Sequence, residues 1–227
     1  MPFGCARLLS VKEDVLEQVV DDYLQLQGYF TTHNVRFNPP KGQYYVAKAD
    51  SVPSDIDVVG FNPLLAGPDR VMVVSCKSWQ SGFDATRILA MLRGEAPNPK
   101  RRAELQFREL WMQRWADGFR QKIEQITGTN VFTYCLAVTK LKGDAAAWGK
   151  DTTIRDNLGG NPFQFLTLER MWGEVLRRVR FTPAASEMGR LAQLLKAAGL
   201  TAPLSGQLPG TDADEVELAS QNAVAAM

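Results

Sequence analysis

The sequence contains little histidine and cysteine, and this scarcity excludes some kinds of site. His33 is the only histidine in 227 residues, and Cys5, Cys76 and Cys135 show no metal-ligand spacing. A zinc site is therefore not expected, because structural zinc sites draw their ligands mainly from Cys and His. Two of the cysteines fall in apolar stretches, which indicates reduced, structural thiols in a cytoplasmic protein.

Long hydrophobic runs are also absent. No stretch approaches the roughly 20 apolar residues of a membrane-spanning helix, and the N-terminus lacks a signal-peptide apolar core. We therefore expect no membrane association. An apolar content of 45% with 22% charged residues is typical of a soluble globular domain.

Basic residues are missing from the C-terminal segment. Residues 201–227 contain no Lys or Arg and four acidic residues, which predicts a flexible acidic tail after one domain at 1–200. Residues 1–200 then hold 26 basic against 21 acidic residues. This mild excess is compatible with a nucleic-acid partner.

Two segments, 54–61 and 71–77, read as neighbouring strands rich in β-branched residues. Side chains alternate between faces, so Ser75 and Lys77 share one face, and pairing can bring Asp57 beside them. Charges on an apolar surface normally indicate pairing, metal binding or catalysis. From these strands alone, a bland interpretation, either a structural ion pair or charged strand ends in solvent, is about as good as a functional one.

The segment 11–27 predicts a helix with apolar residues at helical spacing. Ser10 and Glu13 form a capping-box pattern at its start, and Gly28 is a natural end. Glu17 lies beside the apolar stripe, where a charged residue is usually part of a solvated face.

Together these segments resemble the PD-(D/E)xK, or restriction-endonuclease-like, superfamily, and most of all its Mrr-type and Holliday-junction-resolvase-like branches. In that pattern a first helix carries a Glu, here Glu17, and closes with Gly28-Tyr29 before a strand. The motif Asp corresponds to Asp57, and the final acid-x-Lys to Ser75-Cys76-Lys77. The resemblance covers residues 11–80 well.

The resemblance implies a DNA endonuclease that depends on Mg²⁺ or Mn²⁺. Glu17, Asp57 and the Cys76 carbonyl would bind the metal, with Lys77 and Ser75 as further catalytic residues. The family places Glu, Asp or Gln where this chain has Ser75, and a hydroxyl is a far weaker metal ligand than a carboxylate. The alternative is therefore a catalytically inactive nuclease-fold module for DNA binding or complex assembly.

The remaining segments predict strands at 29–37, 131–139 and 164–166, and helices at 84–92, 100–126, 168–180 and 186–198. Strands with helices before, between and after them favour an α/β fold with three α/β/α layers around a central mixed sheet. The resemblance implies a restriction-endonuclease-like core.

Contacts with DNA are predicted from a loop and two basic clusters. Gln80 follows the Lys77 strand, where a substrate contact and a simple helix-entry turn are comparable interpretations. Phosphates would be bound by Lys100, Arg101 and Arg102 and by Arg177, Arg178 and Arg180. No separate recognition domain is evident, so specificity would come from loops, DNA shape, a second copy in a homodimer or a partner protein.

Overall fold

The computed structural model describes residues 14–42, 45–96, 103–180 and 184–200. The helices are α1 (Val15–Leu26), α2 (Ala47–Asp50), α3 (Ala85–Leu92), α4 (Arg108–Trp111), α5 (Gln113–Thr127), α6 (Ala146–Lys150), α7 (Thr152–Asn157), α8 (Leu168–Arg178) and α9 (Glu187–Ala197), with 3-10 turns η1 (Gly67–Arg70) and η2 (Ala103–Gln106). The strands are β1 (Phe30–Phe37), β2 (Ser54–Phe61), β3 (Val71–Lys77), β4 (Phe83–Asp84), β5 (Thr133–Val138), β6 (Leu141–Lys142) and β7 (Phe163–Thr167).

Five strands form one mixed sheet in the order β1-β2-β3-β5-β7. Strand β2 runs antiparallel to both β1 and β3, whereas β5 and β7 run parallel to β3. Parallel neighbours need crossover connections, and these are supplied by α3 to α5 and then by α6 and α7. The carboxyl ends of β3, β5 and β7 therefore share one edge of the sheet.

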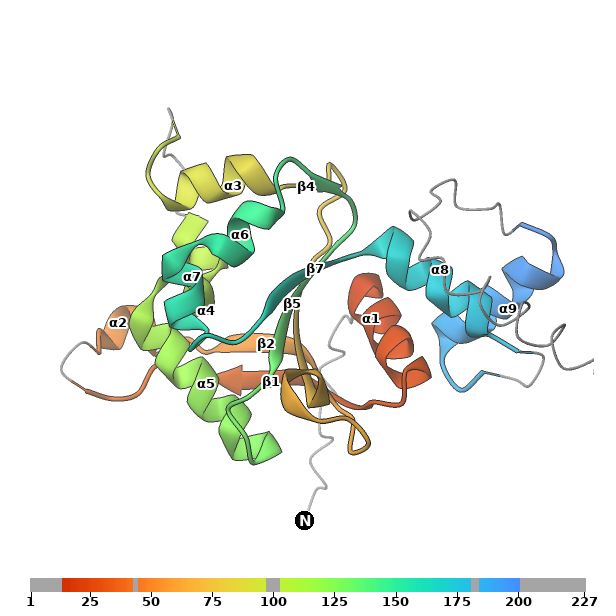
Figure 1. The fold of residues 1–227 in the computed structure, drawn as a ribbon, viewed down its shortest axis with the longest axis horizontal. Helices are drawn as coiled ribbons and strands as arrows, with labels where there is room; N and C mark the ends of the chain where they lie inside the picture. The colour runs from red at the N-terminus through yellow and green to blue at the C-terminus, as the bar shows by residue number, and fades with distance from the viewer. Residues whose placement is uncertain (1–13, 43–44, 97–102, 181–183, 201–227) are drawn as a thin grey trace, which may run out of the picture.

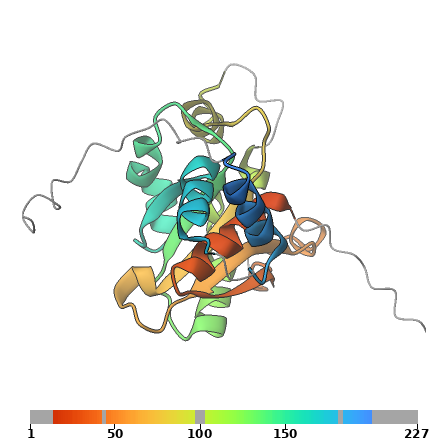
Figure 2. The ribbon, with the colours of Figure 1, turned by 90° about the vertical axis from the view of Figure 1, so that its right-hand side faces the viewer.

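Helices cover both faces of this sheet. Figure 1 shows α1, α8 and α9 on one side and α3 to α7 on the other, and Figure 2 looks onto the first group. On the α1 side Leu24 packs with Val74, and on the other side Phe119 belongs to one apolar cluster with Val73. The predicted three-layer α/β/α architecture is confirmed.

The first helix begins later than the sequence predicted. Its N-cap is Asp14, whose backbone is extended and whose carboxylate accepts from the Leu16 amide at 2.9 Å. Helix α1 therefore begins at Val15 and not at residue 11 as predicted, and Ser10 and Glu13 of the predicted capping box lie outside the described residues. The predicted helix end is confirmed, since Gly28 adopts a positive φ of 86° just after α1.

The predicted continuous helix over 100–126 is also wrong. The described part breaks into η2, α4 and α5, because Phe107 and Met112 have non-helical backbone angles. Most apolar residues at helical spacing along this segment are nevertheless buried, including Phe107, Leu110 and Trp115, whereas Ile126 is 40% exposed. The buried apolar residues thus stay packed against the sheet, although the chain changes direction at Phe107 and again at Met112.

Loops beyond the carboxyl edge carry structure that the sequence did not reveal. Strands β4 and β6 form a second, two-stranded parallel ladder that joins the loops after β3 and β5. Helices α2, α6 and α7 were not predicted either. The predicted Lys100-Arg101-Arg102 cluster and the tail at 201–227 lie outside the described residues.

Candidate active site

Strands β2 and β3 separate where their polar side chains begin. Their ladder extends from Phe61 paired with Val71 to Val58 paired with Val74 and stops there. Strand β2 continues back to Ser54, and β3 continues to Lys77 while still pairing with β5. The two strands therefore form a fork that opens at the carboxyl edge of the sheet.

Asp57 lies in this fork. Its Oδ2 accepts a hydrogen bond from the Cys76 amide at 2.5 Å, which takes the place of a backbone pair between the strands. Burial raises the pKa of the Asp57 carboxyl, while the Cys76 amide and the positive charge of Lys77 act in the opposite direction. The net pKa lies above the ordinary value, so the carboxylate is held in a setting that disfavours its charge.

Ser75 and Lys77 share one face of β3, as predicted. Lys77 Nζ donates to Ser75 Oγ at 3.3 Å, and it lies 5.6 Å from the centroid of the Phe107 ring. The ring face attracts the ammonium. Because Lys77 is engaged with β3 and with Phe107, it is not a solvated strand end.

Glu17 approaches Cys76 from the α1 layer. Burial is the main cause that raises the pKa of the Cys76 thiol well above its ordinary value, and the charges of Asp57 and Glu17 raise it further. Glu17 and Asp57 therefore both act on the β3 residue between Ser75 and Lys77. Glu17, Asp57, Ser75 and Lys77 thus lie around the C-terminal end of strand β3.

Asp14 fixes the position of this helix end. One carboxylate oxygen caps α1, and the other accepts a hydrogen bond from the Ser78 hydroxyl in the loop after β3. The two contacts join the start of α1 to the end of β3. They explain how Glu17, in the first turn of α1, is held near the fork.

Sequence reasoning missed Glu109. Glu109 is only 7% exposed, and its Oε1 accepts a hydrogen bond from the Tyr134 hydroxyl at 2.6 Å. The negative charge of Glu109 contributes to the raised pKa of Asp57, after burial. A signal was available: Tyr134 carries its hydroxyl in a strand that is buried along its whole length, and buried tyrosines normally need a hydrogen-bond partner.

The donors around the fork are hard oxygens, which suit Mg²⁺ or Mn²⁺ better than softer metals. Across the described ranges, no group of three or more His, Cys, Asp or Glu side chains is arranged to hold a metal ion. Mg²⁺ keeps several of its waters and needs only one or two carboxylates. Asp57 and Glu17 with the Cys76 carbonyl meet that smaller requirement in donor chemistry.

The predicted DNA-contacting residues lie at two different places. Gln80 is exposed in the turn that follows β3, three residues after Lys77. Arg177, Arg178 and Arg180 lie at the end of α8, where Arg178 donates to the Leu26 carbonyl at the far end of α1. The arginine cluster is thus about one helix length, roughly 18 Å, from the start of α1 near the fork.

This arginine cluster is partly neutralised. Arg177 pairs with Glu174 at 2.6 Å, and Arg178 pairs with the same carboxylate. The cluster lines a hollow of about 620 Å³ together with Leu26 and Lys196. The surface is basic, but two of its three predicted arginines share one negative charge.

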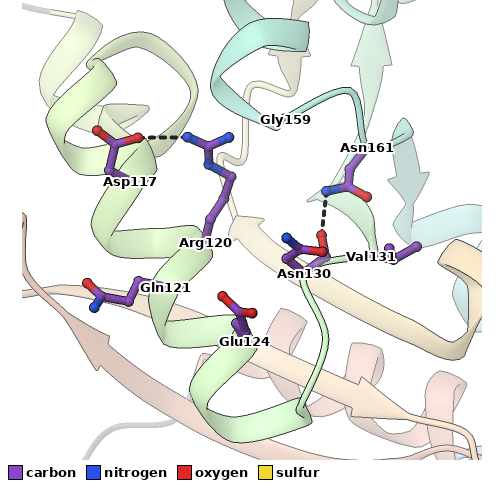
Figure 3. Close-up of a pocket in the computed structure, with 8 residues that line it drawn as sticks. All are labelled: Asp117, Arg120, Gln121, Glu124, Asn130, Val131, Gly159 and Asn161. Carbon is purple, nitrogen blue, oxygen red and sulfur yellow. Dashed lines mark hydrogen bonds and ion pairs between the residues drawn. The ribbon is translucent and has the colours of Figure 1, made fainter.

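A separate polar hollow of about 350 Å³ lies at the opposite edge of the sheet, before β5 and β7. Figure 3 shows Arg120 paired with Asp117 and the Asn161 amide pointing to the Asn130 backbone. These contacts engage Arg120, Asp117 and Asn161 within the chain. The fork at Asp57 is the better candidate for chemistry.

Comparison with protein-family models, curated proteins and solved structures finds no match to this chain. Within the described residues, no helix is both long enough and apolar enough to cross a membrane.

Proposed function

We propose that this protein is a metal-dependent DNA endonuclease of the PD-(D/E)xK type, which hydrolyses phosphodiester bonds. The observation that carries the proposal is the fork, where β2 brings Asp57 against the Ser75-Cys76-Lys77 segment of β3. A three-layer α/β/α fold with a mixed sheet supports it. The free thiols of Cys76 and Cys135 fit a cytoplasmic location.

The residues divide into a metal-binding group and a phosphate-binding group. Asp57, Glu17 and the Cys76 carbonyl would hold Mg²⁺ or Mn²⁺ through oxygen. When bound, such an ion lowers the pKa of its water and neutralises charge on the phosphate. Asp57 is anchored for this task by the Cys76 amide.

Lys77 would act on the reacting phosphate. Its ammonium is held between the Ser75 hydroxyl and the Phe107 ring, so its position is fixed before substrate arrives. From there it can orient the attacking water or stabilise the negative charge that develops on the phosphate oxygens. Ser75 would position Lys77 and a bound water through its hydroxyl.

DNA would reach this edge through sequence-independent phosphate contacts. Gln80 lies three residues after Lys77, and the Arg177, Arg178 and Arg180 cluster could bind the backbone further along the duplex. A second copy of the chain or a partner protein could supply recognition.

A catalytically inactive nuclease-fold module is the second candidate. The observation that favours it is Ser75, which contributes no negative charge and already accepts a hydrogen bond from Lys77. Such a module would bind DNA or join a complex without cleaving.

Plasmid cleavage separates the two candidates. Supercoiled DNA is incubated with the full chain and Mg²⁺ or Mn²⁺, beside the variants Asp57→Asn and Lys77→Ala. The proposal expects metal-dependent nicking that both variants abolish, while Lys77→Ala still binds metal. Asp55→Asn is the matched control, because Asp55 is an exposed carboxylate two residues earlier on the same strand. Binding without cleavage would favour the inactive module.

A further inference from the structure

Glu109 is a buried carboxylate that the mechanism above does not use. It comes from α4, between Phe107 and Leu110, both of which are fully buried. Its carboxylate accepts a hydrogen bond from the Tyr134 hydroxyl at 2.6 Å. A neutral hydroxyl does not balance the charge, and buried carboxylates normally need a positive partner.

Strand register places this carboxylate on the catalytic face of the sheet. Tyr134 pairs with Val73, and Leu136 pairs with Ser75, so the Tyr134 ring stands one pair before Ser75 on the same face. The side chains of Ser75 and Lys77 lie on this face, and Phe107, two residues before Glu109, contacts the Lys77 ammonium. Glu109 thus reaches the fork across the sheet surface, from the layer opposite α1.

The resulting charge balance is negative. Asp57 and Glu109 contribute two carboxylates, and Lys77 contributes one ammonium. The Tyr134 hydroxyl holds Glu109 on the sheet face that carries Ser75, and strand register puts Asp57 beside Ser75, so the two negative charges repel across this face. A divalent cation beside Asp57 would relieve this repulsion, and its binding would be strengthened in turn.

We propose that Glu109 is a positioning residue that strengthens divalent-cation binding at Asp57, with Tyr134 holding its carboxylate under Ser75. The inference rests on the proposed metal-dependent function. Glu109 on α4 would supply the negative charge that Ser75 on β3 lacks. Glu109 acts through space and through the Tyr134 and Ser75 hydroxyls, and it is not itself assigned as a metal ligand.

The test uses Glu109→Gln in the full chain. Glutamine keeps the size of the side chain and an oxygen that accepts from Tyr134, but it removes the charge. Isothermal titration with Mn²⁺ should show about tenfold or greater loss of affinity, as for other residues that support a metal site indirectly. The melting temperature without metal should be unchanged or higher. The exposed Glu124→Gln on α5 is the control and should match the wild type.

A charge-relocation variant distinguishes this role from simple packing. In the Glu109→Gln background, Ser75→Glu should recover most of the lost Mn²⁺ affinity, because it returns one carboxylate to the same face. A packing role for Glu109 predicts no recovery.

Three results would overturn the inference. The first is that the wild type and Glu109→Gln bind Mn²⁺ with equal affinity. The second is a loss of affinity that Ser75→Glu does not recover. The third is a wild type that binds no Mn²⁺, which defeats the proposed function as well and so differs from the first two. Should Glu109→Gln fail to fold, Tyr134→Phe decides instead: it frees the carboxylate, and unchanged Mn²⁺ affinity would count against the inference.

Discussion

The Lys77 ammonium lies 3.3 Å from the Ser75 hydroxyl, on a buried face where Asp57 carries the neighbouring negative charge. A substitution at position 75 therefore changes what the Lys77 ammonium contacts. A change at this position alters the charge balance of the fork directly.

Ser75→Glu should increase metal affinity and metal-dependent plasmid cleavage. The new carboxylate would lie against Lys77 and near Asp57, adding one anionic oxygen donor to a site with few of them. Stability without metal should fall, because Ser75 is only 7% exposed and Glu109 is already close. Calorimetric Mg²⁺ titration, cleavage and melting curves measure the three effects.

Ser75→Gln is the matched control, since it has the size of glutamate without the charge. If the wild type neither binds metal nor cleaves DNA, and Ser75→Glu changes neither property, the endonuclease proposal should be abandoned for the inactive module.

Asp57→Asn should stabilise the metal-free protein while abolishing activity. The asparagine oxygen can still accept from the Cys76 amide, and no charge is left in the fork. Because the folded pKa of Asp57 is raised, its ionisation costs stability above that pKa. The advantage of the variant should shrink as the pH falls through the folded pKa and vanish below the ordinary Asp range.

Thermal unfolding at neutral and acidic pH checks this prediction. Each kcal/mol gained raises the melting temperature of a domain of this size by about 2–4 °C. Added Mg²⁺ should raise the melting temperature of the wild type only. An equal rise in Asp57→Asn would place the bound ion elsewhere.

Arg114→Ala should destabilise the fold strongly. Arg114 Nε lies 3.0 Å from Asp50, a fully buried carboxylate that also accepts from the Val46 amide. Burial raises the pKa of Asp50, but these two donors outweigh burial and hold it below the ordinary value. Removing Arg114 leaves a buried charge uncompensated, which costs about 3–5 kcal/mol.

Urea unfolding measures that cost, and Arg120→Ala is the control on the same helix. Arg120 pairs with the exposed Asp117, and such pairs contribute less than about 1 kcal/mol. Because the pKa of Asp50 is lowered, its contribution is present above the ordinary Asp pKa and is lost as the pH falls through the folded pKa. Equal effects of the two substitutions would contradict the assignment.

Glu174→Gln should strengthen DNA binding. Glu174 neutralises Arg177 and Arg178, and losing it would release two guanidinium groups for phosphates. Neutralising Arg177, Arg178 and Arg180 should have the opposite effect, weakening binding and reducing the salt slope by about one for each lost phosphate contact.

Fluorescence anisotropy on duplex DNA over a range of salt concentrations tests both changes. The control neutralises three basic residues of the other helical layer, Lys122, Lys150 and Arg155. If neither the Glu174 variant nor the arginine-cluster variant changes DNA affinity, the DNA-binding surface lies elsewhere.

Much of the fold was predictable, because period-two and helical patterns dominate its central elements. Strands β2 and β3 were placed with the observed bounds, since their β-branched residues end at Gly-, Pro- and Asp-rich turns. The breaks at Phe107 and Met112 were not predictable, because the apolar spacing through them stays helical and packing on the sheet determines the local backbone. The position of Asp57 relative to Lys77 followed from alternation along two paired strands.

Glu109 shows the limit of sequence reasoning for the site. In the sequence Glu109 follows Arg108 directly, so it reads as one member of a charged helix surface. Only the change of helix direction after Phe107 turns it toward Tyr134, and that turn has no local signature in the sequence.

The hydrogen bond between Asp57 and the Cys76 amide makes one backbone proton a spectroscopic reporter of the fork. An amide proton donated to a carboxylate is expected to resonate downfield in an isotope-labelled sample. Anything that draws electron density from the Asp57 carboxylate, whether a proton or a cation, would move that single peak. Occupancy of the fork could then be followed by nuclear magnetic resonance without DNA and without turnover.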